Sequence, residues 1–377
     1  MKICIVTQKT GKNYGGILQA YALQHFLKQE GHIVETVQHC GSERVSFRIL
    51  LSIIKQIIKK YILRKKVKNI LPDWMNKQQQ QNIQKNLHLF VAQHIVQTPY
   101  IHNFKKLNKY YYDAYIVGSD QVWRPKYNRY QLYEMFLSFV KGNLAKRIAY
   151  AASFGVSEIE FSEPQIKRIS TLLQKFDLIS VREDTAVELC NNYFQVVAHH
   201  VLDPTLLLRK TDYHSLILKE ESENLLTTQE LQNKDELFVY VLDQSPAVSR
   251  IIQQIANDFQ YKPYNFLQLL NDETMPSVVS WLKGIMNARF VITDSFHGTV
   301  FSILFNKPFL TYANQNRGAT RFLSLLKMFH LEERLVLNPE SFNNNYKNPI
   351  DWQTINQIIE KERGNSINFL KNALIKF

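Results

Sequence analysis

Three residues that can carry or transfer charge stand just after short apolar runs of the kind that form buried strands: His297, Asp120 and Arg182. The carboxyl ends of parallel strands meet at one edge of an open α/β sheet, and ligands bind there. A helix that begins after such a strand adds a positive N-terminus that favours an anion. The run 288–301 shows this arrangement, because a Ser/His/Gly turn containing His297 separates its two apolar segments. We therefore predict an anion-binding site around these strand ends.

Each of these residues also has a purely structural interpretation. A lone histidine is commonly satisfied within a core, although the position of His297 at a strand end favours a functional role. Asp120 is placed to act as a general base or to orient a sugar hydroxyl, and equally to cap the segment that follows. Arg182 suits bidentate binding of phosphate or carboxylate, while its neighbour Glu183 offers a surface ion pair instead. Trp123 either stacks on a sugar ring or fills the core.

A glycine-containing segment follows the first expected strand. Residues 9–16 read as a loop that ends in Asn13-Tyr14-Gly15-Gly16. Glycine lets the backbone approach a ligand closely, and it also permits the positive φ of a tight turn. The segment lacks the G-x-G-x-x-G pattern, so it does not indicate a dinucleotide.

The elements that must position these residues form two successive β/α units. We expect a Rossmann-like domain over 1–209, with a basic helical insertion at 44–110, and a second one over 236–377, joined by a charge-dense linker at 210–235. The fold class is therefore α/β, with two Rossmann-like β/α/β domains facing a cleft. Apolar periodicity places strands at 2–7, 33–37, 112–117, 147–152, 178–181, 237–242, 264–270, 288–293 and 307–312, and helices at 17–30, 161–176, 247–258, 278–287, 316–329 and 352–377.

The overall charge and the cysteine content restrict the partners and the compartment. The 377-residue chain has a net charge of +13, which suggests an anionic partner. Nine Lys/Arg and no Asp/Glu lie within 44–69, an amphipathic segment that either rests on anionic lipid or packs on the protein with a solvated basic face. Three cysteines without a CxxC spacing, and histidines without a ligand pattern, indicate a reducing compartment and no metal site. We expect a cytoplasmic protein, at the inner face of the membrane if 44–69 binds lipid.

Several short motifs, taken in chain order, resemble those of the polysaccharide pyruvyl transferase family. The resemblance runs from residue 1 to about 335, which makes it far more specific than any single motif. Its motifs are Asn13-Tyr14-Gly15-Gly16 with Gln19-Ala20, Gly118-Ser119-Asp120-Gln121-Val122-Trp123, Ser180-Val181-Arg182-Glu183, Leu202-Asp203-Pro204 and Thr293-Asp294-Ser295-Phe296-His297-Gly298.

This resemblance implies a GT-B-like pair of domains and a transferase. Phosphoenolpyruvate would be the co-substrate, with no further cofactor, and its pyruvyl group would pass to a sugar or lipid-linked glycan as a ketal with release of phosphate. His297 would contact the donor and is the candidate for proton transfer, and Arg182 would hold the donor phosphate or carboxylate. Many members of the family carry an arginine two residues before the histidine, where this chain has Ser295 and so lacks one cation.

Further candidate contacts follow from the same motifs and from the helix after them. We place the acceptor on the first domain, with Asp120 as its candidate base, and the donor on the second. The candidate substrate contacts are Asn13, Gly15, Gly16, Ser119 and Trp123 on the first domain and Ser295, Gly298, Arg317 and Arg321 on the second. A GT-B glycosyltransferase that uses a nucleotide sugar is the alternative. A basic nucleic-acid-binding protein ranks third, because no RNA- or DNA-binding motif accompanies the charge and we expect no nucleic acid partner.

Overall fold

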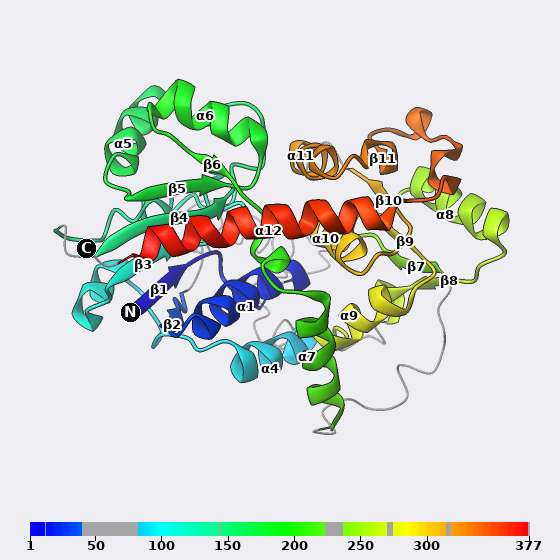
Figure 1. Cartoon of the computed structure of the whole chain (residues 1–377), viewed down its shortest axis with the longest axis horizontal. Coiled ribbons are helices and arrows are strands. Elements are labelled where there is room, and N and C mark those ends of the chain that lie inside the picture. Colours follow the sequence, from blue (N-terminus) through cyan, green and yellow to red (C-terminus); the bar gives the residue numbers. More distant parts are fainter. Residues whose placement is uncertain are drawn as a thin grey trace, which may run out of the picture.

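The first domain is built on a six-stranded parallel sheet. The computed structural model describes residues 1–11, 13–39, 82–142, 145–222, 237–269, 274–313 and 318–375. The sheet order is β2-β1-β3-β4-β5-β6, so the chain moves outward from β1 to β2 and then restarts on the other side with β3 (Figure 1). Its strands are β1 (Lys2–Val6), β2 (Ile33–Thr36), β3 (Ala114–Val117), β4 (Lys146–Ala152), β5 (Leu178–Val181) and β6 (His199–His200). The reversal between β1 and β3 opens a crevice at their carboxyl ends.

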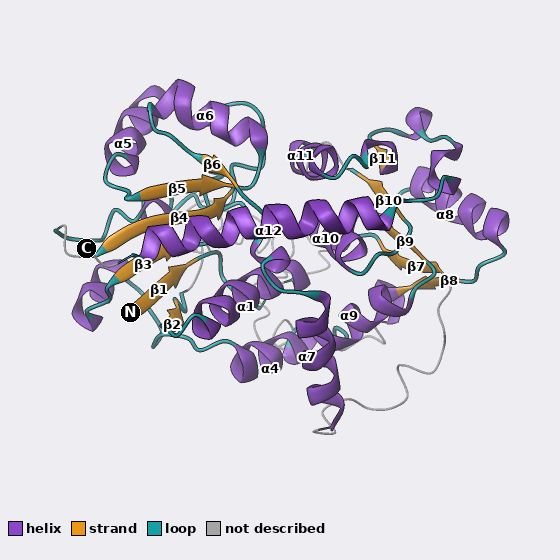
Figure 2. Cartoon of the chain, viewed as in Figure 1, coloured by secondary structure: helices purple, strands orange, loops and turns teal. Residues whose placement is uncertain are grey.

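The second domain repeats the same topology on a five-stranded parallel sheet. Its order is β11-β10-β9-β7-β8, so the reversal falls between β7 and β9. The strands are β7 (Leu237–Tyr240), β8 (Pro263–Asn265), β9 (Phe290–Thr293), β10 (Phe309–Tyr312) and β11 (Leu335–Val336). The expected α/β fold with two Rossmann-like domains is therefore confirmed (Figure 2).

Helices flank both sheets and mostly lie where apolar periodicity predicts them. In the described part of the chain they are α1 (Tyr14–Gln29), α4 (Lys85–His94), α5 (Glu163–Leu173), α6 (Asp184–Phe194), α7 (Lys210–Ser222), α8 (Pro246–Phe259), α9 (Val278–Asn287), α10 (Phe296–Leu304), α11 (Thr320–Met328) and α12 (Trp352–Leu374). Side-chain caps explain several starts: the Ser245 and Ser277 hydroxyls accept hydrogen bonds from Val248 N and Ser280 N at the first turns of α8 and α9.

Two segments differ from the sequence-based expectation. The first half of the expected linker is helix α7, whose Tyr213 is buried against Phe301 with ring centroids 4.9 Å apart; residues 223–235 lie outside the described residues. The terminal helix α12 crosses from the second domain to the first (Figure 1). There Arg363 donates to the carbonyl of Leu206 at 2.7 Å, so α12 fastens the two domains together.

The last three residues of the expected loop 9–16 belong to a helix, whereas its described residues before Tyr14 are not helical. Helix α1 begins at Tyr14, because the Asn13 side chain caps it by accepting a hydrogen bond from Gly16 N at 2.6 Å. The Tyr14 ring enters the second domain, stacks on Trp281 with centroids 5.6 Å apart, and donates through its hydroxyl to the Pro276 carbonyl. The interface between the domains is therefore a packed aromatic core at this point.

The basic segment 44–69 lies outside the described residues, as does most of the expected helical insertion 44–110. Among the helices that are described, none is long and apolar enough to cross a bilayer.

Candidate functional site

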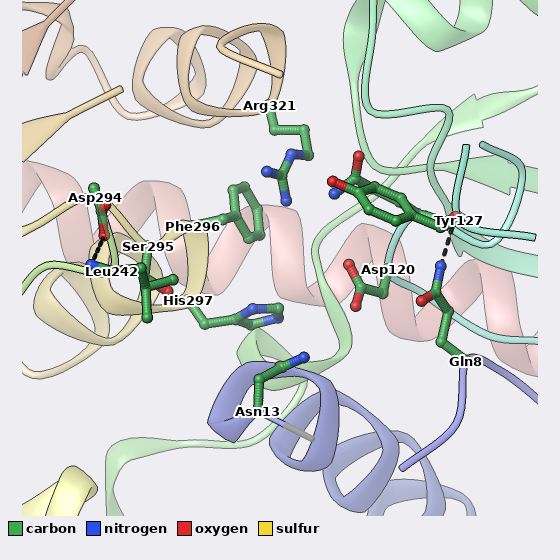
Figure 3. A pocket seen from close by; sticks show the side chains of 11 residues that line it. Gln8, Asn13, Asp120, Tyr127, Leu242, Asp294, Ser295, Phe296, His297 and Arg321 are labelled. Atoms are coloured by element: carbon green, nitrogen blue, oxygen red, sulfur yellow. Dashed lines mark hydrogen bonds between the residues drawn. The ribbon is translucent and has the colours of Figure 1, made fainter. Parts of the chain in front are cut away.

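A pocket lies where the two crevices meet. Loops that follow β1, β3, β7 and β9 line it, so both topological reversals contribute to the same cavity of about 270 Å³. The lining residues are Gln8, Asn13, Asp120, Gln121, Tyr127, Leu242, Asp294, Ser295, Phe296, His297 and Arg321. Arg321, Phe296 and His297 of the second domain lie across from Asp120, Tyr127 and Gln8 of the first (Figure 3).

His297 occupies the first turn of α10, directly after β9. Ser295 caps this helix, and its hydroxyl accepts a hydrogen bond from Gly298 N at 3.4 Å. The imidazole is buried, and its Nε2 lies 3.6 Å from the Asp203 carboxylate of the first domain. Asp294 accepts hydrogen bonds from the backbone N–H groups of Leu242 and Asp243, which ties the turn that carries His297 to the loop after β7. His297 therefore lies at the carboxyl edge of the second sheet, as predicted, and on the wall of the pocket.

Asp203 holds the centre of the buried network. Its Oδ2 accepts hydrogen bonds from Arg182 at 2.8 Å and from Ser119 at 3.1 Å, while Oδ1 accepts from Thr205. Burial alone would raise the pKa of this carboxyl, but His297 and Arg182 outweigh that effect and lower the pKa well below its usual range. Asp203 is thus an anion throughout the physiological range.

Arg182 lies behind the pocket and not on its wall. Its guanidinium is buried and contacts Asp203, Glu183 at 3.3 Å and Asp120 at 3.9 Å, and it covers the Phe296 ring at 4.2 Å. Surrounding carboxylates raise its pKa against the opposing effect of burial. The contact of Arg182 with a donor anion stays a prediction; what the structure adds is that Arg182 neutralises three acids beneath the site.

Arg321 is the arginine that does line the pocket. It comes from α11, is 8% exposed, and lies 5.6 Å from the Phe296 ring centroid. Burial and the neighbouring charge of Arg182 lower the pKa of Arg321 to about 10, so the protein carries a cation there at some energetic expense. Such a cation is suited to a desolvated anion, and the N-terminus of α10 points into the same pocket. The other expected arginine, Arg317, lies outside the described residues.

Asp120 forms the opposite wall in a strained backbone conformation. Its φ of +70° is in the left-handed region, which non-glycine residues seldom adopt and which is common at functional sites. Beside it, Gln8 donates to the Gln121 carbonyl at 2.8 Å, and Arg124 backs the Tyr127 ring at 5.5 Å. Sequence reasoning did not single out Gln8 or Tyr127, because no pattern distinguishes them from other polar loop residues.

Trp123 was expected as a sugar contact, and the structure corrects this. The indole is fully buried, stacks on Phe136 with centroids 5.1 Å apart, and donates to the Met135 carbonyl at 3.0 Å. Its partners all belong to the core of the first domain, so hydrophobic packing accounts for it. Ser119 is likewise buried and serves the site through Asp203.

The candidate glycines act through packing. A Cβ on Gly15 would lie 2.0 Å from His297 Nδ1, and one on Gly298 would lie 2.4 Å from the Thr293 hydroxyl. One on Gly16 would lie 3.0 Å from the Asn13 carboxamide oxygen. Neither Gly15 nor Gly16 has a positive φ, so the tight-turn interpretation is wrong for them. Gly15 instead provides the space that His297 occupies.

The assembled pocket has a cationic wall and an acidic wall. Arg321 and the α10 N-terminus can bind an anion, His297 can exchange a proton with it, and Asp120 can accept a proton from a second, neutral ligand. Within the described ranges, no three His, Cys, Asp or Glu side chains are grouped as a metal site would require.

Comparison with known proteins relates most of this chain to a family. A family model described as polysaccharide pyruvyl transferase matches residues 13–316. No curated protein matches. Among solved structures, UDP-GlcNAc 2-epimerase from Methanocaldococcus jannaschii superposes with a TM-score of 0.48 at 9% identity, covering 99% of this chain and 100% of that one. The Neisseria meningitidis enzyme of the same name, bound to UDP-GlcNAc, gives 0.46 at 10% identity over 100% and 95%. An α-glucosyltransferase in complex with UDP-glucose and DNA gives 0.42 at 9% identity over 98% and 95%.

Proposed function

The chain belongs to the polysaccharide pyruvyl transferase family, and from this premise we propose that it transfers the pyruvyl group of phosphoenolpyruvate to a sugar as a ketal. The observation that carries the proposal is the division of the pocket into a buried cationic wall and an acidic wall supplied by different domains. Phosphoenolpyruvate is the co-substrate, no further cofactor is needed, and the acceptor is a sugar of a glycan or a lipid-linked precursor.

The donor fits the cationic wall. Phosphoenolpyruvate carries a phosphate and a carboxylate, and Arg321 with the α10 N-terminus offers charge and N–H donors to such an anion. Ser295 adds a hydroxyl at the position where a cation is usual in the family, so Arg321 takes a larger share of the donor charge. His297 lines the same pocket, which supports it as our candidate to protonate the enol carbon of a donor.

The acceptor fits the acidic wall. Asp120 is the candidate base for a sugar hydroxyl, and Gln8, Gln121 and Tyr127 supply the amide groups and the aromatic ring that commonly bind a sugar. This assignment leaves the acceptor on the first domain and the donor on the second, so catalysis needs both domains.

The reaction balances with these groups in place. His297 gives a proton to C3 of the enol; the C2=C3 electron pair forms the new C–H bond, and C2 becomes electron-poor. A sugar hydroxyl adds to C2 and loses its proton to Asp120. The C2–O bond to phosphate then breaks, phosphate leaves with that electron pair, and a second hydroxyl closes the ketal. The two sugar hydroxyls release two protons. One restores to His297 the proton that it gave to the methyl group, and the other leaves with phosphate.

An acceptor screen tests the proposal. The purified protein should release phosphate from phosphoenolpyruvate only when the right glycan is present, and mass spectrometry should detect the pyruvyl group on that glycan. His297→Ala should slow the reaction by about a hundredfold or more, the usual scale for a proton-transfer group. Calorimetric binding of a nucleotide sugar and none of phosphoenolpyruvate would favour a glycosyltransferase and overturn the proposal.

A further inference from the structure

The Asp203 carboxylate joins the two domains beneath the pocket. Asp203 lies in the first domain, after β6 and before the short 3-10 helix η5 (Pro204–Leu206), whereas His297 belongs to the second. Asp203 is 2% exposed and His297 is 6% exposed, so their contact takes place away from bulk water. An ion pair that is removed from water is stronger than one at the surface.

Hydrogen bonds fix the orientation of this carboxylate. Thr205 donates to Oδ1 through its backbone N–H at 3.0 Å and its hydroxyl at 2.7 Å. Arg182 and Ser119 donate to Oδ2. With both oxygens held, the carboxylate cannot rotate away from His297, and Oδ2 faces Nε2 at 3.6 Å. Among the described residues this buried Nε2 makes no hydrogen bond, and Asp203 Oδ2 at 3.6 Å is the carboxylate oxygen that faces it.

The other ring nitrogen is oriented by the same arrangement. The His297 ring packs over Gly15, where even a methyl group would collide with Nδ1. Because Nε2 is fully buried against Asp203, Nδ1 is the ring nitrogen left for a ligand that enters the pocket. We propose that Asp203 is a positioning residue that holds the Nε2–H of His297 and thereby makes Nδ1 the nitrogen that transfers the proton. The inference rests on the proposed function for its chemistry, although the Asp203–His297 contact exists without substrate.

This arrangement assigns the proton step to particular atoms. The Nδ1–H bond breaks, its electron pair stays on Nδ1, and the proton bonds to C3 of the donor. Nε2 keeps its proton, which faces Asp203, throughout. A carboxylate that orients a histidine through its second nitrogen is a known way to fix the tautomer and the ring direction.

Nuclear magnetic resonance of the substrate-free protein tests the positioning directly. In protein labelled with ¹⁵N-histidine, a downfield proton signal from Nε2–H should be present and should disappear in His297→Gln, which assigns it. Asp203→Asn should lose or strongly shift this signal. Thr205→Val is the matched control, because it removes a hydroxyl from the same carboxylate and leaves its charge, so the signal should persist.

Kinetics supply the second readout. Asp203→Asn should lower kcat by about 10- to 100-fold, the usual scale for a residue that orients another, with KM for phosphoenolpyruvate changed by less than about threefold. In protein that already carries His297→Gln, Asp203→Asn should lower kcat no further. An unchanged signal in Asp203→Asn, or additive losses in the double variant, would overturn the inference. If no variant turns over phosphoenolpyruvate, the proposed function fails while the resonance experiment still decides the role of Asp203.

A second variant covers the case in which Asp203→Asn does not fold. Ser119→Ala removes one of the two donors to Oδ2, so more of the charge on that oxygen is available to Nε2. The Nε2–H signal should then move further downfield, and no movement in this variant would count against the proposal.

Discussion

Replacement of Arg321 by glutamine should stabilise the empty protein and abolish its stabilisation by anions. Burial and the neighbouring charge of Arg182 lower the pKa of this guanidinium from its ordinary value to about 10, which means that folding penalises the charged form. A shift of that size corresponds to about 3 kcal/mol at pH 7. Loss of the contacts with the Phe296 and Phe322 rings removes about 1 kcal/mol of stabilisation. The net expected gain for Arg321→Gln is therefore about 1–2 kcal/mol without ligand.

The direction of the pKa shift of Arg321 also fixes how its effect on stability depends on pH. Because the pKa of this base is lower in the folded state, the penalty is fully present at neutral pH, begins to fall as the pH rises above about 10, and is gone only above the ordinary pKa of arginine. An anion that pairs with Arg321 removes the penalty at neutral pH. By mass action, phosphoenolpyruvate at a concentration of a hundred times its Kd should raise the free energy of unfolding of the wild-type protein by about 2.7 kcal/mol.

Urea unfolding at pH 7, with and without phosphoenolpyruvate or inorganic phosphate, measures both effects. Arg168→Gln is the control, because Arg168 is an exposed arginine that also covers a ring, that of Tyr133 at 3.6 Å, outside the pocket. The control should leave the anion effect intact. The reasoning is refuted if Arg321→Gln is less stable than the wild type without anion and is still stabilised by anions to the same extent.

Three further predictions follow from the site. Gly15→Ala should lower turnover by about a hundredfold by displacing His297 and should cost about 1–3 kcal/mol of stability, because the new Cβ would overlap the buried imidazole, whereas Gly364→Ala, where a Cβ meets nothing within 4 Å, should have no effect on activity. Trp123→Phe should lower the free energy of unfolding by about 1–3 kcal/mol and leave KM for the glycan unchanged; a raised KM would restore the sugar-contact interpretation. The depressed pKa of Asp203 adds stability that is present above about pH 4 and is lost as the pH falls further, so Asp203→Asn should flatten the acid limb of a melting-temperature profile.

Local pattern was sufficient for most strands and for most helices, but not for the two-residue strands β6 and β11, which are too short to show an apolar period. Buried parallel strands such as β3 and β9 are continuous apolar runs, and the predicted helix 278–287 coincides with α9. The start of α1 was missed because glycines at its first turn argue against a helix locally. There the capping bond of Asn13 and the packing of Tyr14 in the other domain outweigh the propensity.

Charge density misled the assignment of the linker. Residues 210–222 combine lysine and glutamate with Leu216 and Ile217, which are buried, and charged residues are good helix formers when one face packs. Similarly, the sequence offered for Arg182 either an anion contact or a surface pair with Glu183. The pair with Glu183 is present but buried, and the other two carboxylates, Asp120 and Asp203, reach Arg182 only through tertiary contacts.

The motifs that identify the family act largely on one another. The glycine of the first motif makes room for the histidine of the last, since Gly15 leaves the space that His297 fills. The aspartate of Leu202-Asp203-Pro204 binds both Arg182 and, across the domain boundary, His297. Because each of these contacts joins segments that are remote in sequence, a single substitution in one motif should disturb His297 in another. A motif alone does not show what its residues contact. Several residues that the motifs suggest as substrate contacts have His297 or Asp203 as their immediate partner.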